Sequence, residues 1–196
     1  MVQFTPELLI LLIIDAAGGR LRGKTLLHKR GFFVCLGLEY DTTGYNAHYY
    51  GPYSPTIDAT LGRMKALGFI DERSEGFGRV DRVGFEWRRY EFTLTQDGRK
   101  ILSRYEQQLP EVVNAVREYL QRMERAGDDG DYVALSIAAK IFYILHSQQK
   151  PMTYSEICNT AQKLGWDIAS EQIDQAAQFL KRMNLVKANK PQKTEE

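Results

Sequence analysis

The sequence predicts a mainly helical protein that carries one small β-hairpin. Segments with helical spacing of apolar residues begin at a cap residue or a proline, as at Thr5-Pro6 and Ser54-Pro55. Short apolar or alternating runs at 69–70 and 90–94 instead indicate two antiparallel strands joined by a long, flexible, Gly- and Arg-rich loop. The 196 residues, of which 43% are apolar and 26% charged, are enough for one or two packed domains and exclude disorder throughout.

Three helices are predicted before the hairpin. The first covers about residues 5–17, and apolar residues surround it, so we expect it at the centre of the core. The second covers 24–38. The third begins at Ser54 and ends at Gly68, and one inward stripe runs along it: Ile57, Leu61, Met64 and Leu67.

Three helices followed by a hairpin predict a winged helix-turn-helix domain, which we place at residues 1–108, including a further helix from Thr95. A connecting helix that starts at Pro110 fills residues 109–126, before a linker at 127–130. Helices at about 131–147, 153–164 and 170–183 then predict a second helix-turn-helix-like helical unit over 131–186. Residues 187–196 are expected to be a frayed tail.

An internal repeat supports this second unit. A shift of 116 positions places residues 54–70 on 170–186, keeps the apolar stripe, and matches Gly68 with Asn184, both of which tolerate the left-handed conformation. A shift of 128 aligns the preceding helices, so the first copy contains an insertion of about twelve residues, within which segment 41–50 falls. The alternative is a chance register of two amphipathic helices.

Charge and hydropathy exclude several classes of protein. The net charge of +1 gives no overall attraction to nucleic acid or anionic lipid, so such binding must come from local patches. The longest apolar run, residues 8–14, is too short to span a membrane and lacks the flanks of a signal peptide, so we expect a cytoplasmic protein. Cys35 and Cys158 lie far apart and are predicted to be core residues, without a disulfide or a metal site.

The sequence indicates no enzyme. The three histidines, His28, His48 and His146, are scattered, and neither a glycine-rich phosphate loop nor a nucleophile motif is present, so we expect no catalytic residues and no cofactor. Any acid-base groups would lie near His48, Tyr50 and Tyr53. The alternative there is a packed, hydrogen-bonded histidine.

Candidate DNA contacts come from the predicted third helix, the wing and the second helix. Small residues and Arg63 lie on the outward face of the third helix, with Lys65 on its flank and Asp58 as an opposing charge. The segment from Arg20 to Arg30 is the most basic in the chain, and a solvated face is its simpler interpretation. Predicted groove or phosphate contacts are Arg63, Lys65, Arg79, Arg82, Arg88, Arg89, Lys29 and Arg30.

Tyrosines concentrate between Tyr40 and Tyr53, where they offer a recognition surface for a protein partner. The predicted partner-binding residues are Tyr45, Tyr49, Tyr50 and Tyr53. The alternative is that Tyr49 and Tyr53 pack this insert against the third helix. In the second unit, Phe179 takes the outward position that matches Arg63, so we expect that face to pack on the 110–126 helix or on a second chain.

The runs Gly23-Lys24-Thr25-Leu26-Leu27-His28-Lys29 and Tyr49-Tyr50-Gly51-Pro52-Tyr53-Ser54, with the 61–70 helix end, resemble YwgA-like bacterial proteins. They are similar, more distantly, to the Panacea antitoxin domain. The resemblance covers roughly residues 8–72, and it implies a winged-helix fold and, through the Panacea domain, toxin neutralisation. It brings no catalytic residues.

The function expected from the sequence is that of a winged-helix protein that binds duplex DNA, as a homodimer, and regulates transcription of a bacterial or phage defence or toxin locus. The alternative is an antitoxin or adaptor module that binds a protein such as a toxin through the tyrosine-rich insert and the third helix. Near-neutral charge favours this alternative.

Overall fold

The computed structural model describes residues 4–40, 44–80 and 86–187, and for residues 77–80 and 86–88 it describes the backbone alone. The described part is mainly helical, with a small antiparallel sheet of three strands. No helix in these ranges has the length and apolar character that a membrane span needs.

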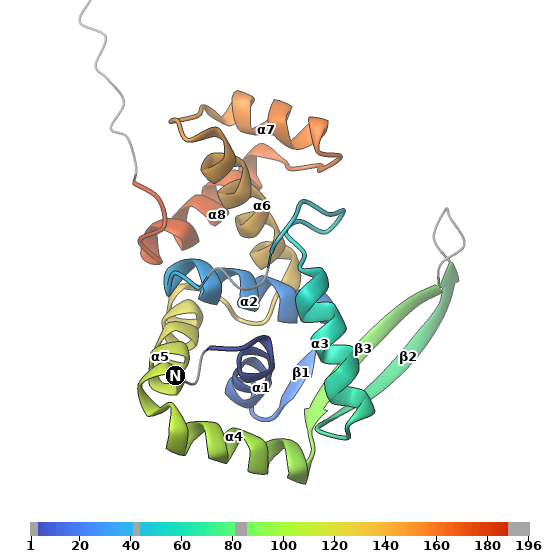
Figure 1. Cartoon of the computed structure of the whole chain (residues 1–196). Helices are drawn as coiled ribbons and strands as arrows, with labels where there is room; N and C mark the ends of the chain where they lie inside the picture. Colours follow the sequence, from blue (N-terminus) through green and yellow to red (C-terminus); the bar gives the residue numbers. More distant parts are fainter. Residues whose placement is uncertain (1–3, 41–43, 81–85, 188–196) are drawn as a thin grey trace, which may run out of the picture.

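Helix α1 (Pro6–Ala16) forms the centre of the core, as predicted. Thr5 caps it by accepting a hydrogen bond from the Leu8 amide, and every residue from Leu8 to Ile14 is at most 1% exposed. In Figure 1, α2 (Lys24–Gly37), α3 (Pro55–Ala66), α4 (Gln96–Gln108) and α5 (Pro110–Ala126) surround it. An apolar residue on any side of α1 therefore meets another element.

The hairpin is longer than the sequence suggested. Strands β2 (Ile70–Val80) and β3 (Glu86–Leu94) extend through most of the stretch that we expected to be a loop, with an irregularity in pairing between Gly76 and Val80. Among the described side chains of the hairpin, Ile70, Phe92 and Leu94 at its base are buried in the core, and the two strands project from the body (Figure 1).

The sequence did not predict strand β1 (Arg20–Arg22), which pairs with β3 and gives the sheet order β1-β3-β2. Only Leu21 of this strand is buried. A strand of three residues is too short to show a recognisable alternation, and it forms here because β3 supplies the partner backbone.

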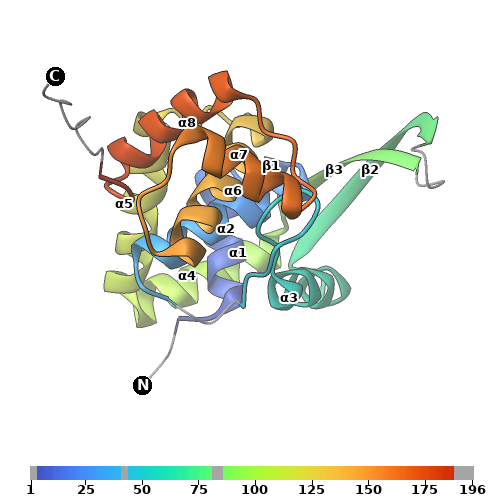
Figure 2. The ribbon, with the colours of Figure 1, turned by 90° about the horizontal axis from the view of Figure 1, so that it is seen from above.

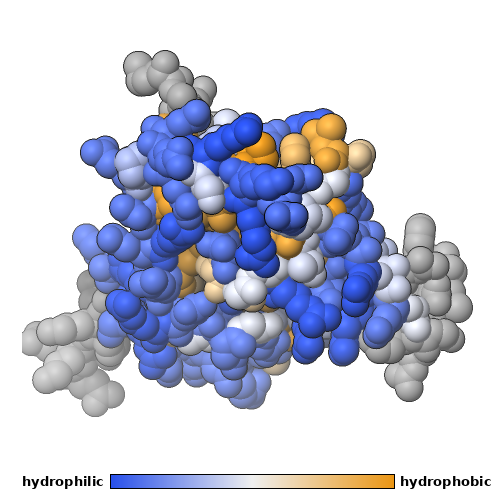
Figure 3. Space-filling view, turned by 90° about the horizontal axis from the view of Figure 1, so that it is seen from below, coloured by the Kyte–Doolittle hydropathy of each residue, from blue (hydrophilic) through white to orange (hydrophobic). Residues whose placement is uncertain are grey.

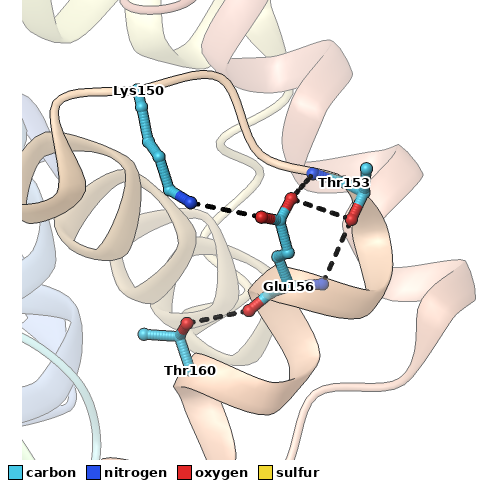
Figure 4. A network of polar contacts seen from close by, with 4 residues as sticks. All are labelled: Lys150, Thr153, Glu156 and Thr160. Carbon is cyan, nitrogen blue, oxygen red and sulfur yellow. Dashed lines mark hydrogen bonds and ion pairs between the residues drawn. The ribbon is translucent and has the colours of Figure 1, made fainter.

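The C-terminal part consists of α6 (Tyr132–Gln148), α7 (Tyr154–Lys163) and α8 (Ser170–Arg182). These three helices lie over α2, as the view from above in Figure 2 shows. Figure 4 shows the start of α7, where Thr153 and Glu156 form a capping box and Lys150 pairs with Glu156 at 3.2 Å. These local bonds fix the predicted helix start.

The predicted N-terminal domain and second unit share one continuous hydrophobic core. Helix α2 is the element between them: its residues from Leu26 to Cys35 are all buried, with α1 on one side and α6 on the other. Surfaces away from the core are polar, and the face seen from below in Figure 3 is largely hydrophilic with small hydrophobic areas.

Candidate functional site

Helix α3 presents the smooth outer face that its sequence predicted. Ala59, Gly62 and Ala66 are exposed, while Ile57, Leu61 and Met64 are buried against the core. The prediction that Leu67 belongs to the same inward stripe is wrong: it lies just past the last residue of α3 and is 66% exposed. A Cβ added at Gly62 would meet nothing within 4 Å, so the space outside this turn is open. Such a face allows another surface to approach the helix backbone closely.

The two cations of α3 are engaged in surface ion pairs. Arg63 Nη2 lies 3.1 Å from a carboxylate oxygen of Glu7 and also donates to Thr60 Oγ1 at 2.9 Å. Lys65 Nζ lies 2.6 Å from a carboxylate oxygen of Glu72 on β2. Exposed pairs of this kind contribute only about 0.2–1 kcal/mol, so a competing anion displaces them at small cost.

The hairpin beside α3 carries further arginines. Arg73 and Arg89 are exposed on β2 and β3. Arg79 and Arg88 also belong to these strands, but their side chains lie outside the described residues, and Arg82 lies outside them altogether. The projecting backbone thus holds Arg73 and Arg89 away from the core.

The basic segment before and within α2 divides into an exposed part, whose cations are paired with acids, and a buried part. Arg20 and Arg22 both pair with Glu91 on β3, at 2.5 and 3.5 Å. Lys24 pairs with Asp58 on α3. The acids come from distant parts of the chain, which is why the segment looked unbalanced when read alone.

The prediction that Lys29 and Arg30 contact phosphates is corrected by their burial, at 2% and 6% exposed. Lys29 Nζ donates to the Pro52 carbonyl at 2.7 Å, and Arg30 Nε donates to Asp128 Oδ2 at 2.8 Å. Burial, and next the charge of Lys140, lower the pKa of Lys29 to about 7. The two side chains thus connect α2 with the segments that contain Pro52 and Asp128.

His28 and His48, scattered in the sequence, come together around one tyrosine ring. The His28 ring stacks on Tyr53 with centroids 4.6 Å apart, and the His48 ring lies 5.0 Å from Tyr53. Burial lowers the pKa of His28 to about 3, while partial burial and a hydrogen bond to Asp58 raise the pKa of Tyr53 to about 12. Neither group titrates near neutral pH, so packing is the better interpretation of this cluster.

Asp58 of α3 is hydrogen-bonded to this cluster through Tyr53. Although partial burial opposes the change, hydrogen bonds from Lys24 and Tyr53 lower its pKa. Its carboxylate is thus compensated by a cation, which reduces the repulsion of phosphate that the sequence suggested.

The four predicted partner-binding tyrosines divide into two kinds. Tyr49 and Tyr50 are 70% and 52% exposed, with ring centroids 4.9 Å apart in an edge contact. Tyr45 and Tyr53 face inward: the Tyr45 ring packs on Phe32 at 5.2 Å, and Tyr53 packs on the histidines. Of the two tyrosines expected to pack the insert, Tyr53 does so and Tyr49 does not.

The loop that carries Tyr49 and Tyr50 is held on both sides. The Trp166 indole donates to the His48 carbonyl at 2.7 Å, and Lys29 holds the Pro52 carbonyl. Gly51 has a φ of +93°, and a Cβ there would approach Lys140 Cγ to 2.9 Å. The turn therefore requires glycine. The Lys29 and Trp166 anchors could not be predicted from the sequence, because they join residues distant in the chain.

Phe179 on α8 packs on a neighbouring element, though not on the one expected. It is 8% exposed, and its ring meets Phe33 of α2 at 5.3 Å. A hollow of about 230 Å³ lies beside it, between the 126–131 segment and α8. Within the ranges that the structure describes, no group of histidine, cysteine, aspartate and glutamate side chains has the arrangement of a metal site.

These features define a mainly helical protein with a small antiparallel sheet, whose α3 and hairpin form one exposed edge. Comparison with protein-family models gives no match, and comparison with curated proteins gives no significant match.

Proposed function

We propose that the chain binds duplex DNA through α3 and the β2–β3 hairpin. The observation that carries the proposal is the placement of an exposed small-residue helix face beside a projecting arginine-bearing hairpin (Figure 1). In winged helix-turn-helix proteins the corresponding helix enters the major groove and the hairpin contacts the backbone or the minor groove.

The order of elements supports a winged helix-turn-helix domain. The chain runs helix, strand, helix, helix and then two strands, and β1 completes the sheet beside β3. α3 starts at a firm boundary because Ser54 accepts a hydrogen bond from the Ile57 amide and Pro55 occupies the first turn. The helix is thus held at its start while its outer face stays open.

The charges on α3 favour DNA binding of moderate affinity that depends strongly on the salt concentration. Arg63 and Lys65 already have carboxylate partners, so phosphates must compete with Glu7 and Glu72. Because each added phosphate contact releases counterions, the affinity falls with salt in proportion to the number of contacts. Transcriptional regulation by a homodimer, which the sequence suggested, remains one form of this proposal.

The test is fluorescence anisotropy with a labelled duplex from the region upstream of the chain's own gene and a scrambled duplex, at about 50 and 200 mM salt. Arg63→Ala is expected to weaken binding to the upstream duplex by about tenfold and to reduce its preference over the scrambled one. Arg73→Ala with Arg89→Ala is expected to weaken both duplexes equally and to lower the salt slope. The matched control is Arg125→Ala, an exposed cation on α5, away from the hairpin.

Two results would overturn the proposal. One is absence of salt-dependent binding to either duplex. The other is equal loss of affinity in Arg63→Ala, the hairpin double variant and Arg125→Ala, because a diffuse cationic surface explains that result without α3.

A second candidate function is protein binding through Tyr49 and Tyr50, as in an antitoxin or adaptor. Its support is the exposure of both rings on a loop fixed from both sides, because a rigid aromatic anchor loses little entropy on binding. Capture of the product of a neighbouring toxin-like gene tests it. Tyr49→Ala is expected to abolish capture and Tyr132→Ala, at another exposed tyrosine, to retain it. Retention by both variants, with circular dichroism unchanged, would count against this function.

A further inference from the structure

A hollow lined by aromatic side chains lies beside the contact between α2 and α6. Its volume is about 450 Å³, within the range of roughly 300–1,000 Å³ that small-molecule sites occupy. Helices α2 and α6 contribute to its lining together with three residues of the segment between α2 and α3. Among the described residues, the lining consists of Phe32, Cys35, Leu36, Glu39, Tyr40, Tyr45, Phe142, Tyr143 and His146.

The walls of this hollow are braced by ring contacts. Phe32 lies between the rings of Tyr45 and Phe142, at 5.2 and 6.2 Å, and Phe142 in turn stacks on His146 at 5.8 Å. Tyr40 stacks on Phe4 with centroids 3.9 Å apart. Because these rings pack on one another and on Phe4, the site is formed before any ligand arrives.

Tyr45, which lines the hollow, packs closely against Gly31 of α2. A Cβ at Gly31 would lie 2.6 Å from the Tyr45 hydroxyl, so only glycine admits the ring at this depth. That hydroxyl is buried and, among the described residues, has no hydrogen-bond partner. The burial of this hydroxyl holds the Tyr45 ring in place at the edge of the hollow.

The charge of the lining selects the ligand class. Among the described lining residues, Glu39 alone is an acid, and no lysine or arginine lines the hollow. Aromatic faces attract cations through their quadrupoles, and a carboxylate adds a direct attraction, whereas the described lining offers an anion no lysine or arginine. We propose that this hollow binds a small organic cation with an apolar or aromatic body, such as an aryl or alkyl ammonium compound. The proposal does not depend on DNA binding.

Isothermal titration calorimetry of the full chain with three probes of similar shape tests this site. The probes are (4-hydroxyphenyl)trimethylammonium, its uncharged isostere 4-tert-butylphenol, and the anion 4-hydroxybenzoate. The ammonium probe is expected to bind about tenfold more tightly than the isostere, although its desolvation is more costly, and the anion is expected to bind most weakly.

Two variants test whether the ammonium probe binds in this hollow. Glu39→Gln, at an exposed residue, is expected to weaken the ammonium probe by about tenfold and to leave the isostere unchanged. Tyr143→Leu keeps an apolar side chain but removes a ring face, and it is expected to weaken the ammonium probe more than the isostere. Glu124→Gln, an exposed acid on α5, is the control for total charge.

The proposal is overturned if the isostere binds as tightly as the ammonium probe, or if Glu39→Gln and Glu124→Gln weaken that probe equally. It is also overturned if none of the probes binds at millimolar concentration. Thermal melting of each variant, followed by circular dichroism, separates loss of the site from loss of the fold.

Discussion

Lys29→Met removes the buried ammonium and retains an unbranched side chain. The pKa of Lys29 is about 7 in the folded protein, because of burial and then Lys140, against an ordinary value of 10.5. Between these two values the unfolded chain keeps a proton that the folded chain has lost. The unfolded state therefore binds more protons there, and the free energy of unfolding rises with pH over this interval.

The magnitude follows from that difference. A full proton corresponds to about 1.4 kcal/mol per pH unit, so raising the pH from about 7 to about 9 is expected to stabilise the wild type by about 2 kcal/mol through Lys29 alone. In Lys29→Met this contribution is absent. The variant also leaves the Pro52 carbonyl without its donor, which costs about 1–3 kcal/mol at every pH.

The assay is urea unfolding followed by circular dichroism at about pH 7, 8 and 9, with Lys100→Met as the control. Lys100 is an exposed lysine paired with Asp97, so Lys100→Met also takes one lysine charge from the unfolded chain but removes no buried proton site. The expected result is a pH-dependent difference between wild type and Lys29→Met, and a constant difference for the control. A wild type and Lys29→Met that run parallel from pH 7 to 9 would refute the reasoning.

Three further predictions concern the core. Asp128→Asn leaves Arg30 buried without a carboxylate and is expected to cost about 3–5 kcal/mol in urea unfolding, whereas replacing both partners with apolar residues costs less. Gly31→Ala forces a Cβ against the Tyr45 hydroxyl and is expected to lower the melting temperature; adding Tyr45→Phe restores it, and a failure of that rescue would contradict the contact. His28, whose pKa is lowered to about 3 by burial, is expected to stay neutral at pH 5 in an NMR titration; a midpoint near 6.5 would show that it is solvated.

Local signals were sufficient to predict most helices. Caps and first-turn prolines mark helix starts within a few residues, as at Thr5, Ser54 and Thr153, because these side chains bond to backbone amides of the same turn. The outer face of α3 was also predictable, since helical spacing assigns Ile57 and Leu61 to the inside and leaves the small residues outside.

The internal roles of Lys29 and Arg30 were not predicted, because they depend on partners far along the chain. Asp128 follows Arg30 by 98 positions, and Pro52 follows Lys29 by 23. One signal was present in the sequence: apolar residues occupy several faces of α2, with Leu26 and Phe33 on the same face as Lys29. A helix with apolar residues on several faces packs against more than one element, so the polar side chains between those faces must find internal partners.

The ends of α3 and α8 share one backbone feature, but the two helices differ in what they expose. Gly68 after α3 and Asn184 after α8 both have positive φ, at +72° and +57°, as their alignment in the proposed repeat suggests. Yet Arg63 on α3 is exposed, and Phe179 at the matching position of α8 is buried against α2. If α3 reads DNA, α8 is not an equivalent second reader within the same chain. Recognition of a two-fold symmetric site then requires a second chain, which sedimentation of the protein with such a duplex would detect.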